Sequence, residues 1–228
     1  MLNIKHVSKV VGSAVCAAAL FFGAIAQANT VELTAVADSV VLDGASSQNL
    51  VPGLLSSELN TSGAGSVWLS LLKFDLTGLA NVQVNSARLE LTTIFNHNSN
   101  AFSHQVFSSS DDNWSESTVN GLNRPTDASL TWLAAIDING VSKTYSWNVL
   151  GGVIGADGLG GAGHELTLVV RPDLNQSAST FGPHFIDRTA LSGVPKLSLD
   201  VSPVPEPASW WLLLVGTAFI TRFARTKR

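Results

Sequence analysis

Apolar and polar residues alternate along most of the chain between residues 29 and 203. The clearest case is 87–92 (Ala-Arg-Leu-Glu-Leu-Thr), where every second side chain is apolar. A period of two is typical of a β-strand with one buried face. The same pattern predicts further strands at 31–36, 38–42, 68–76, 102–107, 130–138, 141–149, 166–170 and 196–201.

Two of these strands predict specific core positions. In 68–76 the apolar face carries Trp68, Leu72, Phe74 and Leu76, with Lys73 and Asp75 on the opposite face. In 141–149 one face carries Val141, Tyr145, Trp147 and Val149. Strand tryptophans with apolar neighbours are expected in the core, so we place Trp68, Trp132 and Trp147 there. The alternative is that one of the three lines an exposed groove on a sheet face, and the alternation does not indicate which.

No long helical pattern interrupts these strands. The stretches between them are rich in Gly, Ser and Asn, as in 60–65 and in the flexible loop expected at 151–163. Many short strands joined by polar loops are typical of sandwiches. The sequence therefore predicts an all-β fold, a two-sheet antiparallel jelly-roll sandwich, flanked by an N-terminal signal peptide and a C-terminal short hydrophobic helix.

The N-terminal residues have the composition of a secretory signal. Lys5 and Lys9 precede an apolar stretch, and Ala26-Gln27-Ala28 follows it. This order predicts a signal peptide at 1–28, removed by signal peptidase after Ala28. The only cysteine, Cys16, lies within it, so the mature protein is expected to contain no disulfide.

The C-terminal segment 204–228 combines Pro205-Glu206-Pro207, an apolar run at 208–221 and a tail with four cations. As a helix the run would span roughly 21 Å, less than the hydrocarbon core of about 30 Å. This segment resembles the PEP-CTERM sorting signal. The resemblance implies export through the inner membrane, transient membrane insertion, recognition by an exosortase, and release to the cell surface or extracellular matrix. The alternative is a plain membrane anchor.

Charge narrows the partners of the predicted domain at 29–203. It contains eleven Asp and five Glu against seven Lys and Arg, which gives a net charge of −9. The whole chain has a net charge of only −4, because six of its thirteen cations lie in the two terminal signals. An acidic domain is a poor partner for nucleic acid or other polyanions. We therefore expect no nucleic-acid partner.

Several segments in order resemble one family of bacterial modules. They are 71–76 (Leu-Leu-Lys-Phe-Asp-Leu), 86–91 (Ser-Ala-Arg-Leu-Glu-Leu), 113–120 (Asn-Trp-Ser-Glu-Ser-Thr-Val-Asn) with Asn123-Arg124-Pro125, 145–149 (Tyr-Ser-Trp-Asn-Val), and 185–188 (Phe-Ile-Asp-Arg) with 194–197 (Val-Pro-Lys-Leu). The set is similar to the DNRLRE-type domains, jelly-roll modules related to carbohydrate-binding modules. Asn148 and Thr189 depart from the pattern, which often has Asp and Glu there.

The resemblance implies a polysaccharide ligand, and Trp114 with Glu116 is the sharpest local feature for it. An indole can stack on a sugar while a carboxylate accepts from its hydroxyls. The alternative, which we favour, makes Trp114 part of the core. Arg88 and Arg124 are the further ligand-binding candidates. With Lys143 they are the mid-domain cations that could bind a polyuronate, a ligand that the net charge of −9 disfavours.

Metal and catalytic signals are weak. Asp111 and Asp112 form the densest oxygen cluster, and a structural calcium ion there is the alternative to two solvated carboxylates. No His pair has zinc-site spacing, and there is no nucleophile elbow or phosphate loop. We expect no cofactor beyond that calcium ion and no enzyme activity.

These observations favour an exported, non-enzymatic surface or matrix protein that binds carbohydrate. The alternative is a purely structural surface or biofilm-matrix protein without a small ligand. A polysaccharide-active enzyme is a third hypothesis, because paired carboxylates meet only in space.

Overall fold

The computed structural model describes residues 28–46, 53–60, 66–79, 82–96, 101–155, 164–176 and 182–204. The predicted signal peptide, except Ala28, and Pro205, Glu206 and Pro207 with the apolar run after them lie outside these residues. No helix in the described part of the chain is long and apolar enough to cross a membrane.

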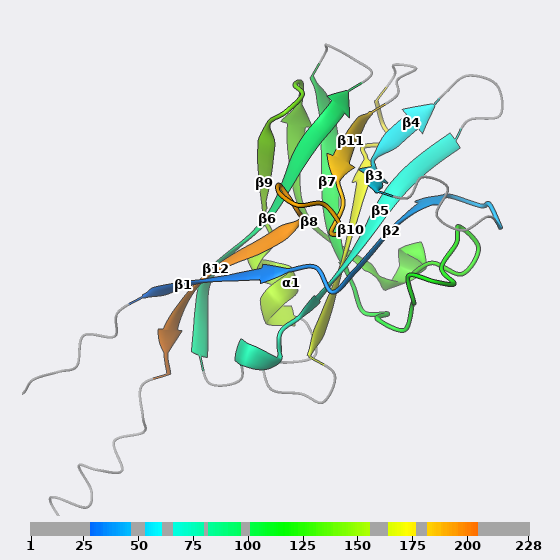
Figure 1. The fold of residues 1–228 in the computed structure, drawn as a ribbon. Helices are drawn as coiled ribbons and strands as arrows, with labels where there is room; N and C mark the ends of the chain where they lie inside the picture. The colour runs from blue at the N-terminus through cyan, green and yellow to red at the C-terminus, as the bar shows by residue number, and fades with distance from the viewer. Residues whose placement is uncertain are drawn as a thin grey trace, which may run out of the picture.

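Two antiparallel sheets pack face to face (Figure 1). The first has the order β1-β12-β6-β11-β3, with β9 also paired to β6; the second has the order β2-β5-β10-β7-β8, with β4 also paired to β5. The strands of the first sheet are β1 (Asn29–Thr34), β3 (Leu54–Ser56), β6 (Val82–Asn96), β9 (Thr144–Asn148), β11 (Pro183–Ile186) and β12 (Lys196–Pro203). Those of the second are β2 (Ala37–Leu42), β4 (Glu58–Asn60), β5 (Ser66–Asp75), β7 (Phe102–Ser109), β8 (Leu130–Ile138) and β10 (Glu165–Pro172). The predicted all-β fold with two antiparallel sheets is confirmed.

Helical structure is confined to short pieces. Two 3-10 turns occupy Thr77–Leu79 and Asp127–Ser129, and α1 spans Leu150–Gly155. The prediction of a flexible loop at 151–163 is therefore wrong for its first residues, which belong to α1. There Gly152 and Val153 are buried, and a Cβ on Gly152 would lie 2.9 Å from a methyl of Leu133. Glycine lets α1 pack closely against β8.

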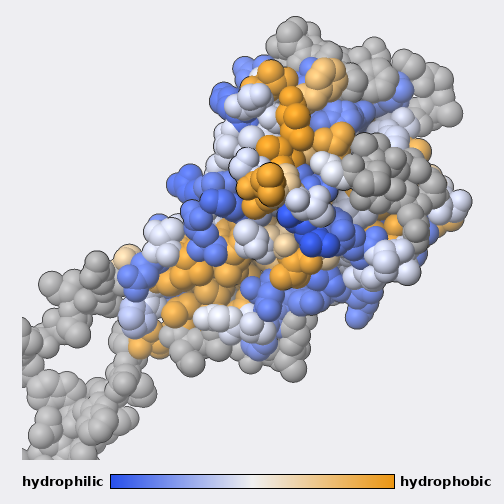
Figure 2. All heavy atoms as spheres, viewed as in Figure 1, coloured by the Kyte–Doolittle hydropathy of each residue, from blue (hydrophilic) through white to orange (hydrophobic). Residues whose placement is uncertain are grey.

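The main core fills the space between the sheets. Its buried side chains alternate along the strands as predicted, with Ala87, Leu89 and Leu91 of β6 inside and Arg88 outside. At the β1 side this core is only partly covered. Figure 2 shows apolar residues gathered around β1, where Val31 and Leu33 pack on the core but remain partly exposed.

A second apolar cluster lies on the outer face of the second sheet. It contains Val41, Leu69, Leu71, Phe107 and Val169 from the strands, together with Trp114 and Val119 from the β7–β8 connection. That connection, residues 110–129, therefore covers part of the sheet. As a result β5 is buried on both faces, and Lys73, predicted to face away from the core, is only 8% exposed.

The structure corrects three further details. Val141 is exposed and precedes β9, and Trp68 is only half-buried. Strands β3, β4 and β11 were not predicted from periodicity, because segments of three or four residues are too short to show it.

Candidate functional site

Trp114 lies in the second apolar cluster rather than on the surface. Its side chain is 7% exposed, and its indole Nε1 donates a hydrogen bond of 2.9 Å to Thr167 Oγ1 of β10. The Lys73 ammonium lies 5.2 Å from the ring centroid. The ring is therefore occupied by protein contacts on this sheet, which fits the packing role that the sequence favoured.

Lys73 connects the β7–β8 connection to the sheet. Its Nζ donates to the carbonyl oxygens of Asp112 at 2.6 Å and Trp114 at 3.1 Å, and lies 3.0 Å from a Glu165 carboxylate oxygen. A buried ammonium needs such partners, because its transfer from water is otherwise costly. Lys73 thus serves the fold and offers no free charge to a ligand.

Glu116 pairs with Arg188, which lies 72 residues further along the chain. Glu116 Oε2 accepts from Arg188 Nη2 at 2.7 Å and from Nε at 3.0 Å, while the Arg188 backbone N–H donates to buried Asp38 at 2.7 Å. Nearby, the Thr189 backbone N–H and hydroxyl both donate to Asp187. Glu116 therefore holds the β11–β12 connection against the segment that follows Trp114.

Burial raises the pKa of Asp38 to about 6, against the lowering effect of the Arg188 backbone N–H. Since the pKa of Asp38 is higher in the folded protein than in the unfolded chain, protonated Asp38 stabilises the fold relative to ionised Asp38. This contribution to the free energy of unfolding is full below about pH 4 and is lost as the pH rises through about 6.

Asp38→Asn should remove this pH-dependent loss of stability. The unfolding free energy of the variant, relative to wild type, should increase between about pH 4 and 6.5 by at most about 3 kcal/mol. Chemical denaturation of both proteins across this pH range measures the difference. Parallel curves of unfolding free energy against pH for the two proteins would contradict a raised pKa of Asp38.

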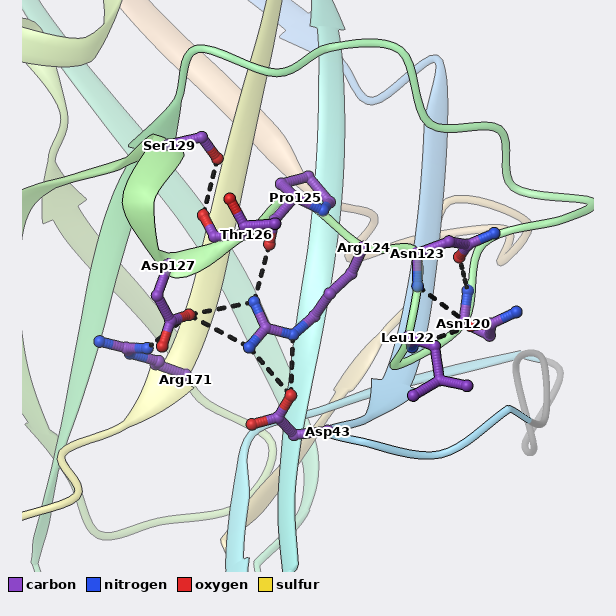
Figure 3. A network of polar contacts seen from close by, with 10 residues as sticks. All are labelled: Asp43, Asn120, Leu122, Asn123, Arg124, Pro125, Thr126, Asp127, Ser129 and Arg171. Atoms are coloured by element: carbon purple, nitrogen blue, oxygen red, sulfur yellow. Dashed lines mark hydrogen bonds and ion pairs between the residues drawn. The ribbon is translucent and has the colours of Figure 1, made fainter.

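Arg124 is the centre of a second polar network (Figure 3). Its guanidinium donates to Asp43 at 2.9 and 3.0 Å, to Asp127 at 3.1 Å and to the carbonyl of Pro125 at 2.7 Å. Asp127 also accepts from Arg171 of β10 at 3.3 Å. Two cations and two carboxylates thus fix the β7–β8 connection to β2 and β10.

Arg88 lies elsewhere. It is exposed on the first sheet, between Ser198 of β12 and Asn148 of β9. Trp114 and Arg124 belong to the second sheet's side, and Glu116 is bonded to Arg188. The structure therefore does not bring these four sequence-predicted ligand residues together in one place.

The two aspartates proposed for calcium both accept backbone hydrogen bonds. Asp111 Oδ1 accepts from Asn113 N at 3.1 Å, and Asp112 Oδ1 accepts from Thr167 N at 3.0 Å. Across the described ranges, no three His, Cys, Asp or Glu side chains group as a metal site. Calcium usually takes six to eight oxygen ligands. The calcium hypothesis gains no support from these contacts and stays a prediction.

One buried polar group was not anticipated. Ser57 Oγ lies 2.8 Å from His104 Nδ1, and both residues are buried. Burial lowers the pKa of His104 to about 3, so the ring is neutral at pH 7. Although a Ser–His contact is typical of nucleophile activation, this serine is 0% exposed and no substrate can reach it.

A shallow cleft lies where β7 ends beside α1. It is lined by hydroxyl side chains and glycine, among them Ser108, Ser110, Thr131 and Gly152, with a volume of about 140 Å³. Ligand pockets of drug size have volumes of about 300–1,000 Å³. The cleft is therefore too small to hold a ligand of that size by itself.

Trp132 is the one predicted core tryptophan that the structure places outside. It is 57% exposed on β8, the edge strand of the second sheet. The register shifts there, since Val106 pairs with Ala134 but Phe107 pairs with Trp132. This bulge leaves Leu133 packed on the core and turns Trp132 to the outer face, beside Phe107. Trp132 had been placed inside because its strand neighbours are apolar, and no sequence signal marked the bulge.

The comparison with known families agrees with this architecture. The model of carbohydrate-binding module family 96 matches residues 29–173, which run from β1 through β10. The remaining strands β11 and β12 complete the first sheet. No curated protein matches the chain significantly. Because the match covers well over half of the sequence, with the whole second sheet and four of the six strands of the first, the chain belongs to carbohydrate-binding module family 96.

Proposed function

We propose that this protein is an exported, non-enzymatic module that binds an uncharged polysaccharide at the cell surface or in the extracellular matrix. Membership of carbohydrate-binding module family 96 carries the proposal, since it supports carbohydrate binding in general and suggests a non-catalytic domain. The signals at the two ends of the chain, including Ala26, Ala28 and Pro205-Glu206-Pro207, support the export part.

Charge supports an uncharged ligand. Five of the seven cations in 29–203 form ion pairs with carboxylates of the same domain: Lys73, Arg124, Arg171, Arg188 and Lys196. Within the described residues, Arg88 and Lys143 make no ion pair, and Lys143 lies 5.0 Å from the Tyr145 ring centroid. A polyuronate would therefore meet a net-negative surface with few unpaired cations.

Affinity gel electrophoresis tests the binding function. The exported protein, purified from its culture, is run through gels that contain dextran, mixed-linkage β-glucan, galactomannan or alginate. At least one neutral polysaccharide should retard the protein, and alginate should not. Retardation by none of the neutral polysaccharides would contradict the proposal.

A structural role without a ligand is the alternative. Polar loops and ion pairs within the domain suit a spacer equally well. Sedimentation analysis distinguishes the two: concentration-dependent self-association without glycan binding would favour a structural unit, whereas a monomer retarded by a glycan would favour the binding module.

Export and processing need a separate test. The intact mass of the protein, recovered from a host that has an exosortase, should correspond to cleavage after Ala28 and near Pro205–Pro207, with the product outside the cell. A full-length tail retained in the inner membrane would instead indicate a plain anchor. Signal peptidase and the exosortase are the processing partners in this proposal.

A further inference from the structure

From the geometry at the edge of the second sheet we infer that Trp132 is the stacking platform for the ligand, a neutral hexose chain, and that Gln105, Asp127 and Arg171 bind its hydroxyls. This inference rests on the proposed carbohydrate-binding function and adds the place of binding. We call these four residues the Trp132 face.

The Trp132 face follows from strand register. Trp132 pairs with Phe107, and Phe107 pairs with Val169 of β10, so their side chains share the outer face of the sheet. Gln105 lies two residues before Phe107 on the same strand and pairs with Arg171. The Arg171 guanidinium stacks on the ring of Phe107, 4.3 Å from its centroid, and Phe107 is the residue with which Trp132 pairs.

Two polar groups of this face, those of Arg171 and Asp127, are held in position before any ligand binds. Arg171 donates to Asp127, and Asp127 accepts from Arg124, whose side chain is largely buried. All these bonds use Asp127 Oδ1, and the Asp127 side chain is 62% exposed. Its carboxylate can therefore also accept from a ligand hydroxyl. Groups that are already ordered lose little conformational entropy on binding.

The chemistry of the face selects a sugar. A pyranose presents C–H groups on one face and hydroxyls around its edge, and an indole has a negative π-face that attracts such C–H groups. Trp132 is the only tryptophan classed as exposed in the described part of the chain; Trp68 is half-buried, and Trp114 and Trp147 are buried. Apart from the buried Phe107 with which it pairs, the residues that share the Trp132 face are polar (Gln105, Asp127 and Arg171), whereas the core of a protein–protein interface is mostly apolar.

The local charge balance selects a neutral sugar. Arg124 and Arg171 are matched by Asp43 and Asp127, so the network beside Trp132 has no net charge. A uronate carboxylate would have to compete with these aspartates for the guanidinium groups. Hydroxyl groups can instead use the acceptor and donor sites that remain without breaking an ion pair.

Trp132→Ala tests the inference by affinity electrophoresis in the neutral polysaccharide gels described above. The variant should bind at least about tenfold more weakly, because stacked tryptophans often dominate binding energy. Phe95→Ala, which removes a half-exposed aromatic residue from the first sheet, is the matched control and should bind as wild type. Trp132→Phe should retain part of the affinity, because it keeps an aromatic face.

The outcomes separate the two claims. If wild type binds a neutral polysaccharide and Trp132→Ala binds within about twofold of it, the location is wrong while the function stands. If wild type binds none, the proposed function fails and the inference with it. If Trp132→Ala does not fold, acrylamide quenching of tryptophan fluorescence is measured instead, in wild type and in Trp132→Phe. Wild type should have a quenchable signal that Trp132→Phe lacks, and the polysaccharide should protect this signal from quenching. Equal quenching of wild type with and without polysaccharide would overturn the inference.

Discussion

Trp147→Ala should lower the free energy of unfolding by about 3–5 kcal/mol, the range measured for truncation of large buried aromatic side chains. Trp147 is 0% exposed and lies in the main core on β9. Its ring meets Phe185 of β11 edge-on at 6.2 Å between centroids, and its Nε1 donates to the His104 carbonyl of β7 at 2.9 Å. The side chain thus joins both sheets, and its removal leaves a large cavity and an unpaired buried carbonyl.

Trp147→Phe separates these two causes. It keeps much of the ring but removes the N–H, and should cost less than Trp147→Ala, about 1–3 kcal/mol from the lost hydrogen bond and the smaller ring. Urea denaturation of both variants measures the difference. A loss below about 1 kcal/mol for Trp147→Ala would show that Trp147 does not connect the sheets as described.

Lys73→Met should cost about 2–4 kcal/mol, although methionine fills most of the same volume. The substitution leaves the carbonyl oxygens of Asp112 and Trp114 without their donor and removes the partner of Glu165. Because these bonds connect the β7–β8 connection to β5, near-ultraviolet circular dichroism of the buried Trp114 should also change.

Lys196→Met is the matched control. Lys196 forms an ion pair of 2.9 Å with Glu32, but both side chains are substantially exposed. Exposed pairs contribute little to stability, so its denaturation midpoint should stay close to that of wild type. Equal effects of the two substitutions would mean that the Lys73 contacts are not what stabilises the connection.

Sequence patterning predicted the fold where strands are long and have one buried face. The alternation of Ala87, Leu89 and Leu91 appears in β6, and the expected strand at 130–138 coincides with β8. The pattern placed Lys73 on the correct face but did not predict its burial, because residues 110–129 cover the outer face of β5. That cover depends on contacts distant in sequence, which periodicity does not report.

The candidate site was harder to predict, for two physical reasons. Glu116 pairs with Arg188 across 72 residues and Arg124 pairs with Asp43 across 81, so no local pattern indicates that these charges are already paired. Trp132 was assigned to the core because its strand neighbours are apolar, but a single bulge in β8 turns it to the outer face. A register shift of one residue therefore converts an expected core residue into the centre of the proposed binding face.

We propose that this acidic sandwich binds a neutral glycan by stacking and hydrogen bonds. Calorimetric titration of the exported protein, with oligosaccharides from the polysaccharide that binds best, tests this at about 50 mM and about 500 mM NaCl. Because the ligand is neutral and breaks no ion pair at the Trp132 face, the dissociation constant should change by less than about twofold between the two salt concentrations. A fall in affinity of about tenfold or more at high salt would show that charge drives the binding, and would rule out a neutral ligand held by stacking and hydrogen bonds.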